Sequence, residues 1–216
     1  MDADVEIINI NAEVTINLNG HTITSSARDV FDVAASGNLN LKNDGEKEAQ
    51  IISTTSVDKG SFEWMSGAGA TLTIDPEAKI SLLLTATPAT GFYGVGISKD
   101  AHEAQVTLKN IAITSWTGIY VNGLMPEGKE PTVKLNDISI QTTNGSGIYQ
   151  AGPSNITVTN CNISSPKAVG AEVRAGKLEV KNSVIEGDST TTTVEAEGNG
   201  STTEGAGIAI AQQLQT

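Results

Sequence analysis

Short segments of alternating apolar and polar residues recur along this chain. In VTLKNIAIT, residues 106–114, apolar side chains occupy every second position on either side of Asn110. Such alternation is typical of strands with one buried face, and the runs are too short and too rich in β-branched residues for helices. The pattern predicts two short strands in each unit, joined by a sharp turn at the asparagine.

The second apolar residue of each valine-x-leucine unit provides an anchor for aligning the units. The anchors are Leu18, Leu41, Ile74, Leu108, Leu135, Val158 and Val180. By subtraction, successive anchors are 23, 33, 34, 27, 23 and 22 residues apart. A minimum near 22 residues with longer spacings above it indicates the coils of a solenoid, some of which carry loop insertions.

The position two residues after the anchor is expected to form the turn. It is occupied by Gly20, Asn43, Pro76, Asn110, Asp137, Asn160 and Asn182. All but the proline belong to the residue types that enter the left-handed backbone region at low cost. Isoleucines that recur five residues after the anchor, such as Ile113 and Ile140, are expected to stack inside the rod, with Cys161 as a small core residue beside them.

A third strand opens each coil, often after a glycine, as in GIYV from Gly118 and GIYQ from Gly147. Alternation assigns one outward residue to this strand in each coil. In coil order these are Asp32, Glu63, Gly96, Tyr120, Tyr149, Glu172 and Ala209. We therefore predict an all-β single domain over residues 1–216, a parallel β-helix of about seven to eight coils, with an asparagine ladder at one turn and a long loop insertion at 186–206.

Composition agrees with this fold and excludes several partners. Glycine contributes 22 of 216 residues and aromatic residues 4%, a mixture that favours strands and turns. The net charge of −12 disfavours nucleic acid as a partner. No apolar run is long enough to insert into a membrane, no basic signal-peptide start is visible, and a single cysteine cannot form an internal disulfide.

The asparagine pattern resembles the right-handed parallel β-helix of the pectate-lyase-like superfamily. The segment VTINLNGHTIT, residues 14–24, also resembles units of adhesin-like bacterial surface proteins. The resemblance implies a location outside or on the surface of a bacterium. We expect the chain to be a fragment of a larger surface protein whose signal and anchor lie elsewhere. A β-sandwich remains the alternative fold, although it does not explain asparagines at coil spacing.

The resemblance also implies that ligands bind on the face made by the first strand of each coil. Tyr120 and Tyr149 are expected side by side there, with Trp116 in the preceding loop and Glu172 at the edge. Aromatic rings suit the apolar faces of sugars, and carboxylates accept hydrogen bonds from their hydroxyls. The alternative is a row of stacked tyrosines that only stiffens the sheet.

Acidic residues on the same face raise the question of catalysis. Asp32 and Glu63 are expected on neighbouring coils, a spacing that a two-carboxylate glycosidase or a calcium ion would use, and Glu172 completes the set of candidate acids. The alternative is a solvated acidic face. The Gly-His-Gly and Arg-x-Lys segments of polygalacturonase-like hydrolases are absent, and no metal cluster, nucleophile triad or phosphate loop can be assembled.

The sequence therefore favours a non-catalytic, adhesin-like surface protein that requires no cofactor and binds a glycan or another host or cell-surface ligand. Two further hypotheses stay open at this point. One is a carbohydrate-active enzyme, either a polysaccharide lyase or a glycoside hydrolase. The other is a structural stalk that holds another domain away from the cell. Oligomeric state does not follow from the sequence.

Overall fold

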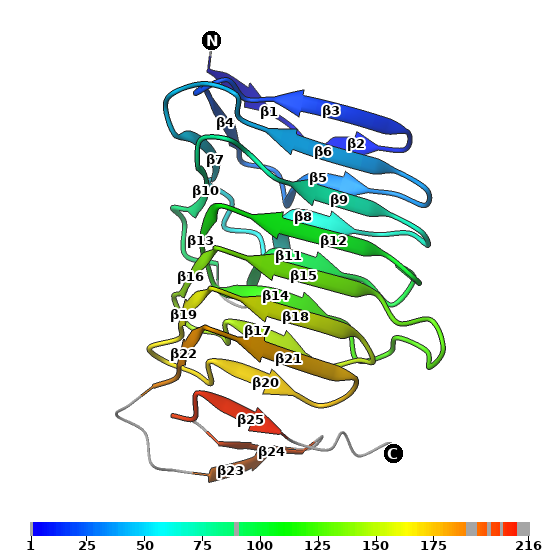
Figure 1. The fold of residues 1–216 in the computed structure, drawn as a ribbon, viewed down its shortest axis with the longest axis vertical. Helices are drawn as coiled ribbons and strands as arrows, with labels where there is room; N and C mark the ends of the chain where they lie inside the picture. The colour runs from blue at the N-terminus through cyan, green and yellow to red at the C-terminus, as the bar shows by residue number, and fades with distance from the viewer. Residues whose placement is uncertain (1, 89–90, 189–193, 198–199, 204, 211–216) are drawn as a thin grey trace.

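A computed structural model shows a parallel β-helix, and it describes residues 2–88, 91–188, 194–197, 200–203 and 205–210. In this part of the chain, strands form three parallel sheets of eight, eight and seven strands, and no helix is present. In the described residues, each of the first seven coils contributes one strand to each sheet and the last contributes one to each of the two eight-stranded sheets. The coils stack along the long axis of the molecule from β1 to β25 (Figure 1). Parallel pairing throughout the three sheets rules out the sandwich, which is built from antiparallel sheets.

Sheet A and sheet B contain eight strands each. The strands of sheet A are β1 (Ala3–Val5), β4 (Thr22–Ser25), β7 (Ala49–Ser53), β10 (Ile80–Leu84), β13 (Ile111–Ser115), β16 (Ser139–Thr142), β19 (Asn162–Ser164) and β22 (Val184–Glu186). Those of sheet B are β2 (Ile8–Ile10), β5 (Asp29–Val33), β8 (Gly60–Met65), β11 (Phe92–Ile97), β14 (Thr117–Val121), β17 (Ile148–Gln150), β20 (Ala171–Val173) and β25 (Ile208–Ile210).

Sheet C completes the coils, and a small fourth sheet lies outside them. Sheet C consists of β3 (Glu13–Asn17), β6 (Asn38–Lys42), β9 (Thr71–Ile74), β12 (Gln105–Lys109), β15 (Thr132–Asn136), β18 (Asn155–Thr159) and β21 (Lys177–Lys181). The predicted loop insertion at 186–206 contains an antiparallel pair, β23 (Val194–Glu197) and β24 (Gly200–Thr203). Residues 189–193, 198–199 and 204 of this insertion lie outside the described residues.

The core is a column of aliphatic side chains from all three sheets. Ile51, Leu82, Ile113 and Ile140 stack in register along sheet A, and Ile113 and Ile140 among them follow the predicted isoleucine pattern. Cys161 is buried and unpaired, in agreement with its predicted place in the core. Three phenylalanines on neighbouring coils, Phe31, Phe62 and Phe92, are fully buried, and the last two meet edge to face with ring centroids 5.0 Å apart. Apolar burial of this extent is the main source of stability for the rod.

The turn between sheets C and A is the sharp corner that the sequence predicts. Asn110, Asp137, Asn160 and Asn182 all have φ values near +50°. Their backbones bond from coil to coil, for example from Asp137 N to Thr159 O at 3.1 Å. Because Asn and Asp tolerate this conformation better than other residues with side chains, they recur at this corner.

Two earlier coils depart from this turn. Asn43 is fully buried, and its side-chain amide donates to the carbonyls of Ala78 and Lys79 on the next coil. Pro76 has no left-handed conformation because its ring fixes φ near −65°. The left-handed turn therefore recurs on successive coils from Asn110 onward, and the side-chain amide of Asn110 donates to the carbonyl of Glu77 at 3.3 Å.

The anchor predicted for the first coil is wrong by two residues. Ile16, not Leu18, pairs with Leu41, so this coil is longer than the aligned spacing indicated. Leu18 follows the end of β3 and is buried at the corner, where its N–H bonds to Lys42 O at 2.8 Å. A shift of two residues keeps the same strand face inward. Alternation alone therefore cannot distinguish Ile16 from Leu18 as the anchor.

Glycines open the strands of sheet B because the coils approach closely at this corner. A Cβ atom on Gly118 would lie 2.4 Å from the carbonyl oxygen of Gly147, and one on Gly147 would lie 2.8 Å from that of Gly170. Contacts this short cannot be accommodated between backbones. The glycine column thus fixes the start of the strands that carry the candidate site.

Candidate binding face on sheet B

The outward side of sheet B is set by its register. Asp32, Trp64, Gly96, Tyr120, Tyr149, Glu172 and Ala209 occupy equivalent outward positions on successive coils. Six of these seven residues are the ones expected from the sequence. Tyr120 and Tyr149 are direct neighbours, as predicted.

Glu63 is the exception, and its predicted outward position is wrong. It pairs with Phe31 and Val95 on the inward side of the sheet and is fully buried. Trp64 takes the outward position instead. On β8 the glycine column is occupied by Phe62, opposite Gly94, so the strand cannot be aligned from its opening glycine. A one-residue shift exchanges the two faces of a strand.

Four aromatic rings form a continuous row across sheet B, from β8 to β17. The ring centroids of Trp64 and Tyr93 are 6.3 Å apart, those of Tyr93 and Tyr120 are 4.4 Å apart and nearly parallel, and those of Tyr120 and Tyr149 are 5.9 Å apart. These are the separations of stacked aromatic side chains. We call these four residues the aromatic row.

Tyr93 joins the row by leaning over a glycine. Its backbone lies at the start of β11, beside Ser61 and Thr117, whereas the equivalent outward position on β11 belongs to Gly96. A Cβ atom on Gly96 would lie 2.4 Å from Trp64 Cε3 and 3.2 Å from Tyr93 Cδ2. The missing side chain is therefore what lets the two rings cover this position. Sequence alternation assigned Gly96 correctly but gave no sign that Tyr93 would fill the gap.

The only two arginines of the chain cap the two ends of the aromatic row. The guanidinium of Arg28 lies 5.9 Å from the centroid of Trp64, and that of Arg174 lies 5.1 Å from the centroid of Tyr149. Both distances are within the range of cation–π contacts. Each arginine also has a carboxylate partner: Arg28 Nε lies 3.1 Å from Asp29 Oδ2, and Arg174 Nε lies 2.6 Å from Glu172 Oε1.

The tyrosine hydroxyls of the row stay protonated at any physiological pH. The pKa of Tyr120 is raised to about 12, chiefly because partial burial disfavours the phenolate and then because Tyr93 and Tyr149 lie close. Burial likewise raises the pKa of Tyr93 and that of Tyr149. The faces of the half-buried rings pack against one another. The row therefore offers neutral hydroxyls and ring edges to a ligand.

The three candidate acids do not converge. Glu63 lies inside the rod, and Glu172 is buried against Arg174. Asp32 is outward, with its Oδ1 buried and without a hydrogen-bond partner. Asp32 and Glu172 lie five strands apart in sheet B, which is roughly 24 Å at the usual strand spacing. Paired glycosidase carboxylates stand within about 10 Å of each other.

Trp116 lies away from the aromatic row. It occupies the bend between β13 and β14 and packs, half-buried, against the core. A Cβ atom on Gly145 of the next coil would lie 2.9 Å from its Cδ1 atom. The structure therefore places this indole at the corner between sheets A and B rather than beside Tyr120.

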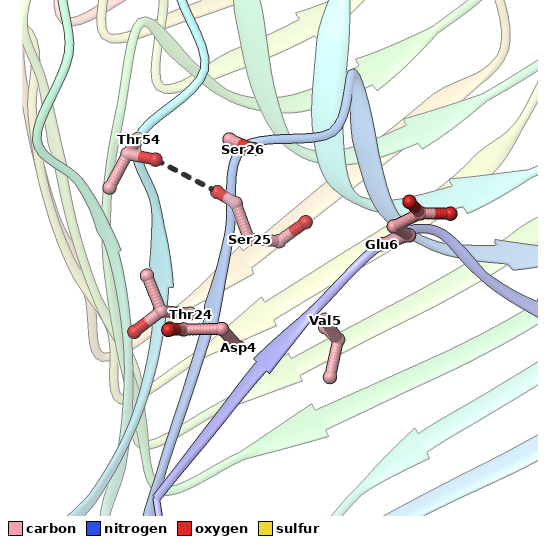
Figure 2. Close-up of a pocket in the computed structure, with 7 residues that line it drawn as sticks. All are labelled: Asp4, Val5, Glu6, Thr24, Ser25, Ser26 and Thr54. Carbon is pink, nitrogen blue, oxygen red and sulfur yellow. Dashed lines mark hydrogen bonds between the residues drawn. The ribbon is translucent and has the colours of Figure 1, made fainter.

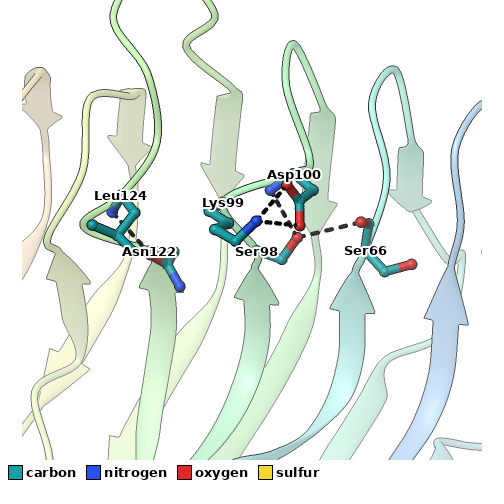
Figure 3. Close-up of polar contacts among 6 residues, drawn as sticks. All are labelled: Ser66, Ser98, Lys99, Asp100, Asn122 and Leu124. Atoms are coloured by element: carbon teal, nitrogen blue, oxygen red, sulfur yellow. Dashed lines mark hydrogen bonds and ion pairs between the residues drawn. The ribbon is translucent and has the colours of Figure 1, made fainter.

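Short polar loops border the row where the sheet B strands end (Figure 3). The Ser98 hydroxyl donates to Ser66 O at 3.3 Å, and Lys99 contacts Asp100 at 2.7 Å. In the longer loop at 122–131, Leu124 is 72% exposed, whereas the adjacent Met125 is buried. Met125 thus packs this loop against the rod, and Leu124 remains exposed to solvent beside the candidate face.

Metal and membrane features do not add to this site. Within the described residues, no group of three or more His, Cys, Asp or Glu side chains is arranged to hold a metal ion. The same part of the chain holds no helix with the length and hydropathy needed to cross a membrane.

Comparisons of the chain with protein-family models, with curated proteins and with solved structures find no match.

Proposed function

We propose that this protein is a non-catalytic, adhesin-like surface protein of the pectate-lyase-like kind that binds glycans along sheet B. The observation that carries the proposal is the aromatic row, which runs across four consecutive coils on one face. A rigid rod presents such a row in a fixed geometry, so that a repeating ligand meets repeating contacts. An extracellular location on a bacterium is part of the proposal.

The chemistry of the row suits hydroxyl-rich ligands. Neutral tyrosine hydroxyls both donate and accept hydrogen bonds, and the ring edges between them offer apolar contact. Asp32, a half-buried residue, lies beside Trp64 at one end of the row, where its carboxylate can accept hydrogen bonds from sugar hydroxyls. Because the tyrosine pKa values are raised, we expect binding through the hydroxyls to be independent of pH between about 5 and 9.

Two double variants separate binding from stiffening of the sheet. Tyr120→Phe with Tyr149→Phe keeps the stacked rings and removes both hydroxyls, whereas Tyr120→Ala with Tyr149→Ala removes the rings as well. On a glycan array, with and without calcium, we expect the wild type to bind and the phenylalanine variant to lose at least tenfold in affinity. Its thermal unfolding should stay close to that of the wild type.

Other outcomes would overturn the proposal. If the wild type binds no glycan at concentrations where weak lectins bind, the row is a stiffening element and the rod acts as a stalk. If the phenylalanine variant binds as well as the wild type, the hydroxyls do not contact the ligand. Release of reducing ends or of unsaturated products from polysaccharides would instead establish an enzyme.

A further inference from the structure

The outward strand positions of sheet A carry no charged side chain over six consecutive coils. From β4 to β19 each strand presents two outward residues, and none of them is charged. They are Thr22 and Thr24, Gln50 and Ile52, Ser81 and Leu83, Ala112 and Thr114, Ser139 and Gln141, and Asn162 and Ser164. All are exposed or half-buried. We call these twelve residues the uncharged face.

This face contrasts with the rest of the molecule. The chain carries 25 acidic and 13 basic residues, and sheet C presents lysines outward at Lys42, Lys109 and Lys134 over the same coils. Charge returns at both ends of sheet A, with Asp4 on β1 and Glu186 on β22. Figure 2 shows the first of these ends, where Asp4 lies beside Thr24. Six coils without charge on a protein of net charge −12 define a distinct surface.

A row of further neutral residues widens the face toward sheet B. Thr54, Thr85 and Thr143 follow the ends of β7, β10 and β16 and are exposed. The hydroxyls of Thr54 and Thr85 donate to backbone carbonyls of the preceding coil, the first to Ser25 O at 3.3 Å (Figure 2). Trp116 stands in this same row next to Thr143, because the residues that precede them, Ser115 and Thr142, are in register.

The surface is also hollowed in its C-terminal half. A shallow depression crosses β13, β16 and β19 and is lined by outward residues of three successive coils, with Glu186 at its far end. Its floor consists of short side chains, among them Ala112, Ser139 and Ser164. A flat sheet with a shallow trough across its strands suits an extended chain better than a compact ligand.

We propose that the uncharged face binds a neutral polysaccharide chain that lies across the strands of sheet A. Hydroxyls and amides repeat here at the strand spacing of ~4.8 Å, which supplies donors and acceptors to a polymer that repeats its own hydroxyls. Ile52, Leu83 and the Trp116 indole offer apolar contact to sugar rings. None of the twelve residues is itself ionised, although two carboxylates adjoin them: the Ser81 hydroxyl donates to Glu48, and Glu186 lies at the far end of the depression. The neutral hydroxyls and amides between them lose water at a lower cost than ionised groups.

The charge pattern also selects against acidic polymers. A uronate or sulfated chain would find no cation on the twelve residues of the uncharged face and would be repelled by the net charge of −12. This site is separate from the aromatic row, which lies on sheet B. The two proposals can therefore fail independently.

Affinity electrophoresis with neutral and acidic polysaccharides tests the proposal. The probes are soluble glucan, xylan and mannan, with polygalacturonate as the acidic counterpart. Thr114→Lys with Gln141→Lys places two charges in the depression, and Thr107→Lys with Thr157→Lys places the same charges on outward positions of sheet C as a matched control. We expect a neutral polymer to retard the wild type and the sheet C variant, and the sheet A variant to bind at least tenfold more weakly.

Three results would overturn the inference. They are equal loss of binding in the sheet A and sheet C variants, retardation by polygalacturonate alone, and no retardation of the wild type by any neutral polymer. The Tyr120→Phe and Tyr149→Phe variant separates the two faces. If it alone loses binding, the aromatic row is the site and the uncharged face is not. If it binds normally while the sheet A variant does not, the uncharged face is confirmed whatever the fate of the sheet B proposal.

Discussion

At the residue scale, Glu63 is the least expected side chain of the molecule. Its carboxyl group is fully buried, and neither oxygen has a hydrogen-bond partner. Burial raises the pKa of Glu63 well above its usual value of 4.5, so the group is neutral in the folded protein at mildly acidic pH. The folded state then binds a proton that the unfolded state releases once the pH exceeds about 4.5.

This difference predicts how stability depends on pH. Because the folded-state pKa is the higher one, the free energy of unfolding should fall as pH rises from about 4.5 to that pKa, and level off above it. Glu63→Gln should remove this contribution, so its stability relative to the wild type should increase with pH. Urea unfolding between pH 4 and 8 measures both proteins.

A control at the surface has the opposite sign. Lys181 and Lys177 hold the pKa of the half-buried Glu179 below its usual value, so the ionised glutamate contributes a small stabilisation above about pH 4.5. Glu179→Gln should lose that contribution. Identical pH profiles for Glu63→Gln and the wild type would show that the Glu63 carboxyl is solvated in the folded protein.

A second residue-scale prediction concerns Gly96. Gly96→Ala should destabilise the protein by about 1–3 kcal/mol, because its Cβ atom would meet the Trp64 ring at 2.4 Å. The combination with Trp64→Ala should cost less than the two single changes together, since the clash is then absent. Urea unfolding of all four proteins completes the cycle, and strict additivity would contradict the contact.

At the element scale, the sharp turn between sheets C and A is the feature most open to test. Asn160 has φ +53° and an exposed side chain, so Asn160→Ala should cost about 1 kcal/mol of stability through its backbone alone. Asn160→Gly should be tolerated better. Asn162→Ala, an exposed change on the neighbouring strand β19, is the control, and an equal cost at both positions would contradict the explanation.

The same elements show what the sequence could predict. From Leu108 to Val180, alternation, turn residue and glycine all indicate one register, and the structure confirms it. Coil 1 was misaligned because Ile16 and Leu18 satisfy the same period of two. On β8 alternation was counted one residue out of register and put Glu63 outward, whereas Trp64 pairs with Asp32 and Gly96 while Phe62 and Met65 fill the core.

The candidate site was only partly predictable for a related reason. Tyr120 and Tyr149 follow from register, because each occupies the same position after its glycine. Tyr93 enters the row from a different position, and Arg28 reaches it from outside the strand. The contact between Tyr93 and Trp64 depends on the space that Gly96 leaves by having no side chain. The spacing of residues along the sequence does not reveal that space.

At the scale of the whole molecule, the two ends of the rod differ from its middle. Val184, Ile208 and Ile210 in the last coil are 54%, 45% and 86% exposed, although Ile208 and Ile210 continue the inward register of sheet B. In the described chain, β21, β22 and β25 each pair on one side only. Apolar residues beside unpaired strand edges favour association, which the net charge of −12 opposes.

This balance predicts weak, salt-dependent self-association. Sedimentation velocity should show a weight-average mass that rises with protein concentration, and more steeply at 0.5 M salt, where the repulsion between charged copies is screened. Ile208→Lys with Ile210→Lys should remain monomeric, because charge at the edge of β25 blocks strand pairing. Val57→Lys changes a loop valine that is 49% exposed and should associate like the wild type. A wild type that stays monomeric throughout would show that the last coil is covered in solution, and an equal effect of Val57→Lys would trace the association to net charge rather than to this end of the rod.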